Sequence, residues 1–271
     1  MALDPGIPQA YAALLAAHRS IRRFEPRPVD PALVDRLLEQ SLQGASSSGN
    51  LNMVSVVKSS DPERRRRLHE LHGGQDMVLE APLLLTFCAD TDRTRLWLAQ
   101  RGARPGFADF LSWHVAAFDA IILAQTTALA LESQGLGICY MGTTVNRMTE
   151  IAAALELPGT CLPVTTLVVG WPAEAPAQRD RLPSRAWIHD EVYRRPTPAA
   201  IDRDYGERES RGWARYRSMG PEVIERMAAH GITSLAQFYT SPIKYDPDRL
   251  GEYSVALEAL LRERGFLPRP P

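Results

Sequence analysis

The stretch from His18 to Phe24 could bind an anion. It reads His-Arg-Ser-Ile-Arg-Arg-Phe and places four ionisable groups and one hydroxyl within seven residues. Arg19 and Arg22 are three residues apart, so on a helical turn they would project from one side. Guanidinium groups match phosphate geometry, and the hydroxyl of Ser20 adds a short donor between them. These residues alone leave two interpretations open, a phosphate-binding site or a solvated basic helix end.

A second group of polar residues lies in the loop Ala-Ser-Ser-Ser-Gly-Asn-Leu-Asn at positions 45–52. The loop falls between a predicted helix and a strand-like segment, where connections are usually short and ordered. Small residues would let a flat ligand approach the backbone closely. A flexible linker is the alternative interpretation.

The elements that would position these groups follow from apolar periodicity and from start and stop residues. Asp30 and Pro31 predict a helix with Asp30 as its N-cap, and Asp61-Pro62 predicts another. We expect helices over 8–18, 31–43, 61–71, 114–134 and 148–155, strands over 53–57, 81–90 and 162–170, a short extended piece at 138–143, and a helical tail over 197–271 with one helix from Trp213 to Met227. Helices therefore alternate with strands, which predicts an α+β fold with a central sheet of mixed strands.

Composition limits the class of protein. A chain of 271 residues with 45% hydrophobic content can bury a sizeable core, and a net charge of −1 provides no global attraction to nucleic acid or membrane. The run Arg64–Arg67 is interpreted as a solvated helix face, with nucleic-acid binding as the remote alternative. The three cysteines lack metal-ligand spacing and indicate a reducing compartment. With no signal-peptide pattern and no long uninterrupted apolar run, we expect a cytoplasmic protein without a metal site.

Five sequence features occur in one order along the chain. They are the His18–Arg22 segment, the Ser46–Ser48 loop, Gly73-Gly74-Gln75, Glu132–Gly137 with Tyr140-Met141-Gly142, and Gly170-Trp171-Pro172 with Arg179-Asp180-Arg181. This order resembles the FMN-dependent nitroreductase and flavin reductase superfamily, and most of all its larger, NADPH-preferring branch. The resemblance covers about residues 10–195 and implies a three-layer α-β-α sandwich around a mainly antiparallel sheet.

The resemblance also implies roles for individual residues in a homodimer with FMN at the subunit interface. His18, Arg19, Ser20 and Arg22 would hold the FMN phosphate, and Arg179 and Arg181 would reach the phosphate or the ribityl chain. The isoalloxazine ring would be lined by Ser46, Ser47, Ser48 and Asn50, bonded at its edge by Gln75, and covered by the backbone of Tyr140, Met141, Gly142 and Thr143. The branch commonly has Gly-Gly where this chain has Gly142-Thr143.

The chemistry implied by the resemblance is NAD(P)H-dependent reduction of nitroaromatics, quinones or free flavin by ping-pong hydride transfer. FMN carries such chemistry, so no catalytic side chain is predicted. Two alternatives stay open: a specialised flavin-dependent dehydrogenase or reductase of one biosynthetic substrate, and an FMN-binding protein with little turnover. For the donor, NADPH or NADH, Arg208 and Arg211 in the tail are candidate ligands of the NADPH 2′-phosphate. We expect an FMN-binding domain over 1–195 and a helical extension over 196–271, packed on the core or on the dimer partner.

Overall fold

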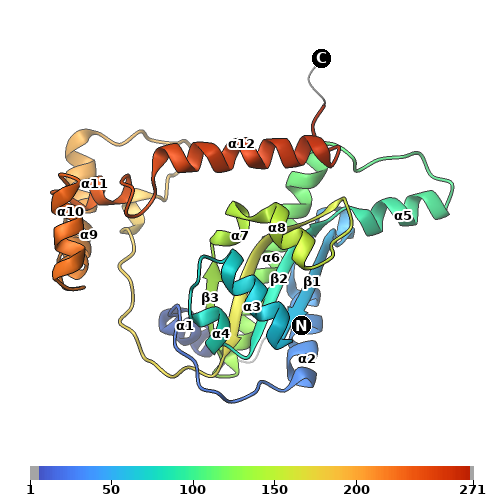
Figure 1. Ribbon diagram of the computed structural model, residues 1–271, viewed down its shortest axis with the longest axis horizontal. Coiled ribbons are helices and arrows are strands. Elements are labelled where there is room, and N and C mark those ends of the chain that lie inside the picture. The colour runs from blue at the N-terminus through green and yellow to red at the C-terminus, as the bar shows by residue number, and fades with distance from the viewer. Residues whose placement is uncertain (1–5, 269–271) are drawn as a thin grey trace. The chain divides into compact units, whose positions relative to one another are not determined.

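The computed structural model describes residues 6–268, and its central element is a four-stranded sheet (Figure 1). The strands are β1 (Val54–Ser59), β2 (Leu83–Asp90), β3 (Gly137–Met141) and β4 (Cys161–Gly170), in the spatial order β1-β2-β4-β3. All three pairings are antiparallel, and an isolated parallel bridge joins Ser20 to Ile138 at the β3 edge. The predicted α+β class and mainly antiparallel sheet are confirmed.

Alternation along β2 shows why the sheet carries helices on both faces. Leu83, Leu85 and Phe87 belong to one buried cluster, while Leu84 between them belongs to another. Successive side chains of a strand point to opposite faces, so a continuous apolar run needs cover on both sides. The first cluster also holds residues of α2 (Pro31–Gly44) and α6 (Phe110–Ser133). The second holds residues of α3 (Pro62–Leu71), α4 (Met77–Glu80) and α8 (Met148–Ala154), which completes three layers.

The helix starts follow local capping chemistry. Asp30 accepts a hydrogen bond from Ala32 N at the start of α2, and Asp61 accepts one from Arg64 N at the start of α3, as predicted. The expectation that the central helix starts at His114 is wrong. Asp109 accepts from Ser112 N and starts α6 at Phe110. The first unit also contains α1 (Ile7–Ala17), η1 (Ser48–Asn50), α5 (Asp92–Gln100) and α7 (Thr143–Asn146).

The described chain divides into two compact units, one with residues up to Gln178 and from Ala256 onward, the other Arg179–Val255. The second unit contains η2 (Ser184–Ala186), α9 (Pro198–Arg217), α10 (Pro221–Ala229) and α11 (Leu235–Tyr239), and α12 (Pro247–Glu263) runs out of it. The expected single helix from Trp213 to Met227 is wrong. Gly220 has φ 115° and Pro221 starts α10, so the helix breaks between them. The functional division predicted at residue 195 stays a prediction.

The central helix α6 is long and apolar enough, by length and composition, to cross a membrane, with a mean hydropathy of 1.5 over its most apolar window. The sequence had indicated no such segment, because polar residues interrupt the run. Within the protein, 44% of that window is buried, and Ala120, Leu123, Ala124 and Leu131 belong to the cluster that packs on the sheet. Packing on the sheet therefore accounts for one apolar face of α6, while large apolar residues on the rest of the helix stay exposed.

Candidate functional site

The His18–Phe24 segment is extended, and the expectation that Arg19 and Arg22 share a helical turn is wrong. Helix α1 ends at Ala17, and Ile21 N then donates to Ile138 O at 2.9 Å. Further along, Phe24 bridges Pro172 in antiparallel fashion. Pairing with the end of β3 and with the chain after β4 thus replaces the local helical bonds. Ile21 and Phe24 are each only 7% exposed, which confirms them as the apolar anchors of the segment.

Two glycines allow this close approach. A β-carbon at Gly137 would lie 2.8 Å from a side-chain carbon of Ile21, and one at Gly170 would lie 2.9 Å from a ring carbon of Phe24. Both distances are shorter than carbon atoms tolerate without a shift of the structure. The absence of a β-carbon at Gly137 and Gly170 therefore lets the basic segment pack directly against the sheet. This packing determines the positions of its polar groups.

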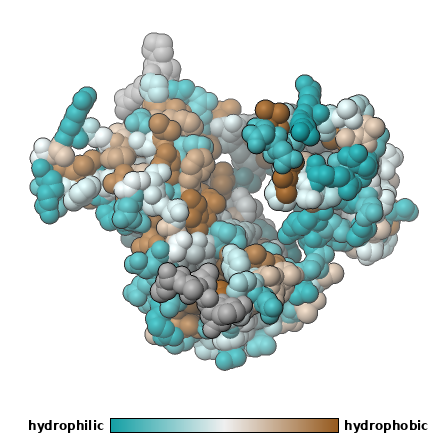
Figure 2. Space-filling view, turned by 180° about the vertical axis from the view of Figure 1, so that it is seen from behind, coloured by the Kyte–Doolittle hydropathy of each residue, from teal (hydrophilic) through white to brown (hydrophobic). Residues whose placement is uncertain are grey.

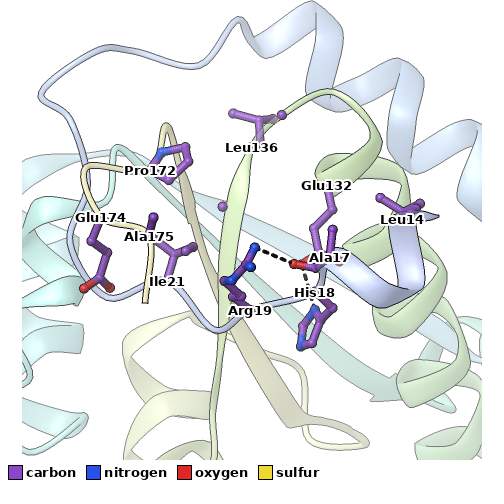
Figure 3. A pocket seen from close by; sticks show the side chains of 12 residues that line it. Leu14, Ala17, His18, Arg19, Ile21, Glu132, Leu136, Pro172, Glu174 and Ala175 are labelled. Atoms are coloured by element: carbon purple, nitrogen blue, oxygen red, sulfur yellow. Dashed lines mark hydrogen bonds and ion pairs between the residues drawn. The ribbon is translucent and has the colours of Figure 1, made fainter. Parts of the chain in front are cut away.

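A cavity of about 340 Å³ lies beside this segment, lined by His18, Arg19, Ile21, Glu132 and Glu174 among others (Figure 3). His18 Nδ1 lies 2.7 Å from Glu132 Oε1, and the other oxygen, Oε2, is buried without a partner among the described residues. Burial raises the pKa of the Glu132 carboxyl, and the hydrogen bond with His18 opposes that rise. The cavity therefore places a buried acid directly behind the imidazole.

The donors on this segment fit a phosphate group. Glu174 Oε1 accepts from the backbone N–H groups of Arg22 and Arg23, at 2.6 and 3.2 Å, so a carboxylate oxygen already occupies an anion position there. The guanidinium of Arg19 bonds only the carbonyl of Ala17, and that of Arg22 only the carbonyl of Ser20. Neither forms an ion pair within residues 6–268. The two guanidinium groups without an ion pair suit a dianion, while the two backbone donors show an anion position that Glu174 fills.

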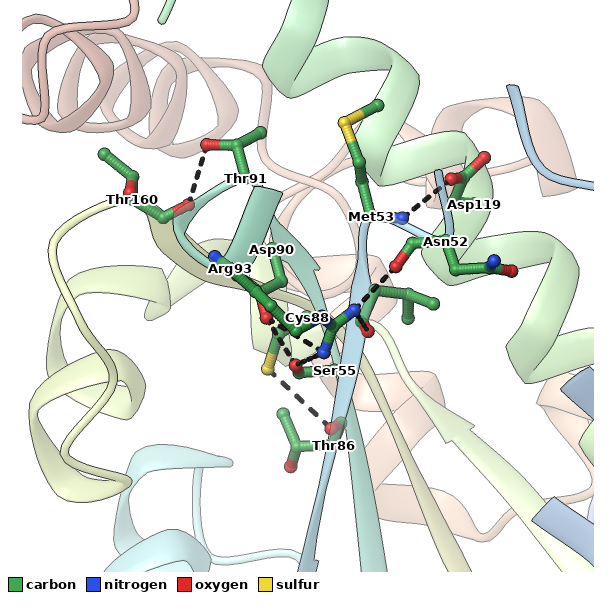
Figure 4. A network of polar contacts seen from close by, with 11 residues as sticks. Asn52, Met53, Ser55, Thr86, Cys88, Asp90, Thr91, Arg93, Asp119 and Thr160 are labelled. Carbon is green, nitrogen blue, oxygen red and sulfur yellow. Dashed lines mark hydrogen bonds and ion pairs between the residues drawn. The ribbon is translucent and has the colours of Figure 1, made fainter. Parts of the chain in front are cut away.

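The serine-rich loop is ordered around the carboxylate of Asp119, which is 3% exposed and projects from α6 (Figure 4). Its oxygens accept from Ser47 Oγ at 2.7 Å, Met53 N at 3.1 Å and Ser48 N at 3.2 Å. Ser47 Oγ in turn accepts from Asn52 N at 2.8 Å. The linker interpretation therefore does not describe this loop.

Ser46, Ser48 and Asn50 remain exposed in this loop, while the hydroxyl of Ser47 is used internally. Asn50 adopts φ 54° after Gly49 at φ 59°, a tight turn that brings backbone to the surface. Exposed small residues on a fixed backbone suit a flat ligand, and their predicted contact with the flavin ring stays a prediction. Sequence reasoning missed Asp119, although it is the lone acid in an apolar stretch.

Arg93 secures the other end of the loop, although no pattern in the sequence pointed to this residue. Its Nη2 donates to the carbonyls of Asn52 and Val54, at 2.6 and 2.9 Å, and its Nη1 donates to Ser55 Oγ at 3.1 Å (Figure 4). Asp90, 8% exposed at its side chain, lies 3.5 Å from Nη1 and supplies the opposite charge. One guanidinium thus ties the start of β1 to the end of β2.

Gln75 and Thr143 meet through a buried histidine. Gln75 Nε2 donates to the carbonyl of His72 at 2.9 Å, and His72 Nδ1 lies 2.7 Å from Thr143 Oγ1 in a hydrogen bond. The His72 ring is fully buried, and this burial lowers its pKa to about 4. A neutral imidazole therefore joins two segments that the resemblance assigns to the flavin ring.

The neutral state of His72 predicts a pH dependence of stability. The unfolded chain titrates with a pKa near 6.5 and the folded one near 4. The stability from neutral His72 is therefore fully present above pH 6.5 and is lost as the pH falls toward 4, by about 2–3 kcal/mol. Urea denaturation at pH 7.5 and 4.5 measures this loss, and we expect His72→Gln to lose less over the same interval. An identical loss in both proteins would contradict the assignment.

The segment from Tyr140 to Thr143 buries the side chain of Met141 and leaves Gly142 exposed. Met141 is 1% exposed, and Thr144 Oγ1 donates back to Met141 O at 2.9 Å. Tyr140 donates its hydroxyl to Gln125 Oε1, and burial with the nearby Glu132 charge raises the pKa of Tyr140 to about 12. A β-carbon at Gly142 would meet nothing within 4 Å. The backbone of this turn is therefore open on one side, as the predicted ring contact requires.

Two of the predicted cations in the second unit, Arg181 and Arg211, have local partners. Arg181 Nη1 donates to the carbonyls of Arg179 and Asp180, and Arg211 forms ion pairs with Asp180 and Glu207. No ion pair joins Arg208 to another described residue. In the first unit, Gln178 Nε2 donates to the carbonyls of Ala16 and His18, so the chain directly before Arg179 lies against the basic segment. The assignment of all these cations to phosphate groups stays a prediction.

Comparison with known proteins decides the family. The nitroreductase family model matches residues 15–171 of this chain. The chain belongs to the nitroreductase family. An FMN reductase [NAD(P)H] of Bacillus subtilis is 37% identical over 184 residues, covering 66% of this chain and 72% of the relative. An oxygen-insensitive NADPH nitroreductase of Salmonella typhimurium is 35% identical over 180 residues, covering 66% and 73%.

A solved structure from Bacteroides fragilis supports the fold of this nitroreductase family member. It superposes with a TM-score of 0.84 at 36% identity and covers 94% of this chain and 99% of that one. The coverage extends well beyond the stretch that the family model matches. The helical region after residue 171 is therefore shared with a structural relative.

Proposed function

We propose that this protein is an FMN-dependent NAD(P)H oxidoreductase that reduces nitroaromatics or free flavin. The observation that carries the proposal is the His18–Phe24 segment, where bare guanidinium groups and carboxylate-bound backbone donors form an anion site. The relatives named as FMN reductase and NADPH nitroreductase support the same cofactor and donor. Quinone reduction, the specialised-substrate alternative and the preference for NADPH stay predictions.

In this proposal the protein binds and orients, and FMN, when bound, supplies the hydride transfer. His18, Arg19, Ser20 and Arg22 would hold the phosphate, with the His18 ring oriented by Glu132 in the wall of the cavity. The backbone of Gly142 and Thr143 and the side chain of Gln75, whose amide also donates to the carbonyl of His72, would donate hydrogen bonds toward the ring edge. Such donors stabilise charge that develops during reduction.

Anaerobic stopped-flow spectroscopy tests the proposal directly. The FMN-loaded protein is mixed with NADPH and, separately, with NADH, and the flavin absorbance is followed before an electron acceptor is added. Rapid bleaching and reoxidation by a nitroaromatic or by free flavin are expected. A yellow protein that neither donor bleaches would instead favour the low-turnover FMN-binding alternative, and a protein that cannot be loaded with FMN would exclude the proposed function.

A homodimer is the expected assembly, and the exposed face of α6 supports it. Figure 2 shows apolar side chains gathered on the back of the molecule. The exposed large apolar residues of α6 are Phe110, Leu111, Phe118, Ile121 and Ile122, each 39–68% exposed. A soluble monomer rarely leaves so many on one helix, so this face suits a subunit interface.

A cytoplasmic location without membrane or nucleic-acid partners also stays a prediction.

A charge on this face is expected to break the dimer. In Ile121→Glu the two-fold symmetry would bury two carboxylates in one interface, which should weaken association by at least about 100-fold. Light scattering after size-exclusion chromatography measures the mass. Leu79→Glu, on α4 at the opposite sheet face, is the matched control and should leave the mass unchanged. A dimeric Ile121→Glu protein would show that the interface lies elsewhere.

A further inference from the structure

A second cavity, of about 680 Å³, lies wholly within the second unit. Its wall is made by η2, by the loop over 187–197 and by the first turns of α9. It contains none of the residues that the resemblance assigned to FMN or to the donor nucleotide. The cavity is therefore separate from the residues to which the proposed function assigns a role.

The cavity carries an excess of positive charge. Four arginines and two aspartates line it, so arginines exceed aspartates by two. Arg185 Nε and Arg203 Nε both donate to Asp204 Oδ1, at 2.6 and 2.9 Å, and these cations hold the pKa of Asp204 below its usual range. The carboxylate of Asp204 is thereby hydrogen-bonded to both Arg185 and Arg203. Within residues 6–268, the guanidinium groups of Arg194 and Arg195 have no ion pair, so they are available to a ligand.

The N-terminal end of α9 adds to the positive charge of the cavity. Thr197 caps the helix by accepting from Ala200 N, and the following 20 residues are helical. The N-terminal end of a helix of this length carries partial positive charge and favours anions. Thr197 and Ala200 both line the cavity, as do Arg194 and Arg195 just before the helix. The helix end and the two free arginines therefore act on the same space.

An aromatic pair lines the same cavity. The rings of His189 and Tyr193 lie with centroids 4.6 Å apart, and Tyr193 is 74% exposed. Arg194 N donates to His189 Nδ1 at 3.4 Å, which ties the imidazole to the backbone beside the free arginines. An exposed ring next to unpaired guanidinium groups is the combination that stacks a base and binds its phosphate.

We propose that this cavity binds an adenosine nucleotide through a phosphate monoester, with Arg194 and Arg195 on the phosphate and Tyr193 against the base. The same chemistry has two sources, the 2′-phosphate end of NADPH or a free mononucleotide. The first source rests on the proposed function, and the second does not. In either case the phosphate contacts are made by Arg194 and Arg195. The sequence-predicted Arg208 and Arg211 do not line this cavity, and Arg211 is already paired with two carboxylates.

Isothermal titration of the FMN-loaded full-length protein with adenosine 2′-phosphate, adenosine 5′-phosphate and adenosine tests the proposal. At least one phosphate should bind, at least tenfold more tightly than adenosine. The double variant Arg194→Ala/Arg195→Ala should weaken that binding by at least tenfold. Arg226→Ala, an exposed α10 arginine without an ion pair among the described residues, should leave it unchanged. Absence of binding, or equal affinity in the double variant, would overturn the proposal.

Kinetics of the double variant then assign the source. If the ligand is the donor, the KM for NADPH rises at least tenfold while the KM for NADH stays the same. If the ligand is a free mononucleotide, both KM values stay the same although mononucleotide binding is lost. NADH oxidation and flavin colour report on the proposed function independently of Arg194 and Arg195. A protein that keeps both but binds no nucleotide phosphate would refute only this inference.

Discussion

Replacement of Arg19 and Arg22 by alanine is expected to yield a folded protein that purifies without flavin. Both guanidinium groups lie on the extended segment that Ile21 and Phe24 anchor, and both lack an ion pair among the described residues. A hydrogen bond to a charged group contributes about 1.5–3 kcal/mol, so each arginine should change FMN affinity by about 10- to 150-fold. Fluorescence titration of the apoprotein with FMN measures the dissociation constant.

Arg23→Ala is the matched control on the same segment. Its guanidinium is ion-paired to Glu80 at 3.3 Å and is therefore engaged away from the proposed phosphate position. We expect its FMN affinity to stay within about threefold of the wild type, since exposed ion pairs contribute little. If the Arg19 and Arg22 variants kept full flavin and lost only hydride transfer, the phosphate assignment would be wrong.

The parts of the fold that local chemistry determines could be predicted from sequence. Asp30-Pro31 and Asp61-Pro62 start helices because an aspartate cap and a proline in the first turn act within a few residues. The β2 strand was predictable because a short run that is apolar apart from Thr86 follows Pro82 and ends at Asp90. Periodicity did not reveal the break at Gly220-Pro221, because apolar spacing continues across it.

The geometry of the basic segment depends on distant residues and could not be predicted from its own sequence. His18 to Phe24 is compatible with a helix end, and only Ile138 O and the chain around Pro172 make it extended. The glycines that admit it, Gly137 and Gly170, lie more than a hundred residues away in sequence. The resemblance to a known family identified the motifs and their order along the chain. The burial of Ile21 and Phe24 determines which polar groups of the segment face outward.

Asp119 illustrates a signal that the sequence did contain. It is the only acidic residue in the apolar stretch from His114 to Leu131, and a buried carboxylate must find donors because desolvation is costly. The apolar helix around Asp119 offers few free hydrogen-bond donors. The loop over 45–52 offers hydroxyls and backbone N–H groups. Pairing the unsatisfied acid with the donor-rich loop would have predicted an ordered turn.

Asp119→Ala is expected to lower the free energy of unfolding by about 3–5 kcal/mol. The substitution removes the common acceptor of Ser47 Oγ, Ser48 N and Met53 N, all at least partly shielded from water. Met53 is 1% exposed, so its N–H cannot turn to solvent without local opening. Urea denaturation at neutral pH measures the change. Because the serine loop then loses its fixed backbone, we also expect weaker FMN binding in the folded variant.

Comparison among variants separates the carboxylate from general disruption of α6. Ser133→Ala, on the exposed end of the same helix, should change stability by less than about 0.5 kcal/mol. Ser47→Ala should cost about 1–2 kcal/mol, and its effect should shrink when Asp119 is already alanine, because the two side chains share one hydrogen bond. Fully additive effects would show that Ser47 and Asp119 act separately. Coupling would instead establish that one buried carboxylate shapes the loop that the flavin ring is expected to contact.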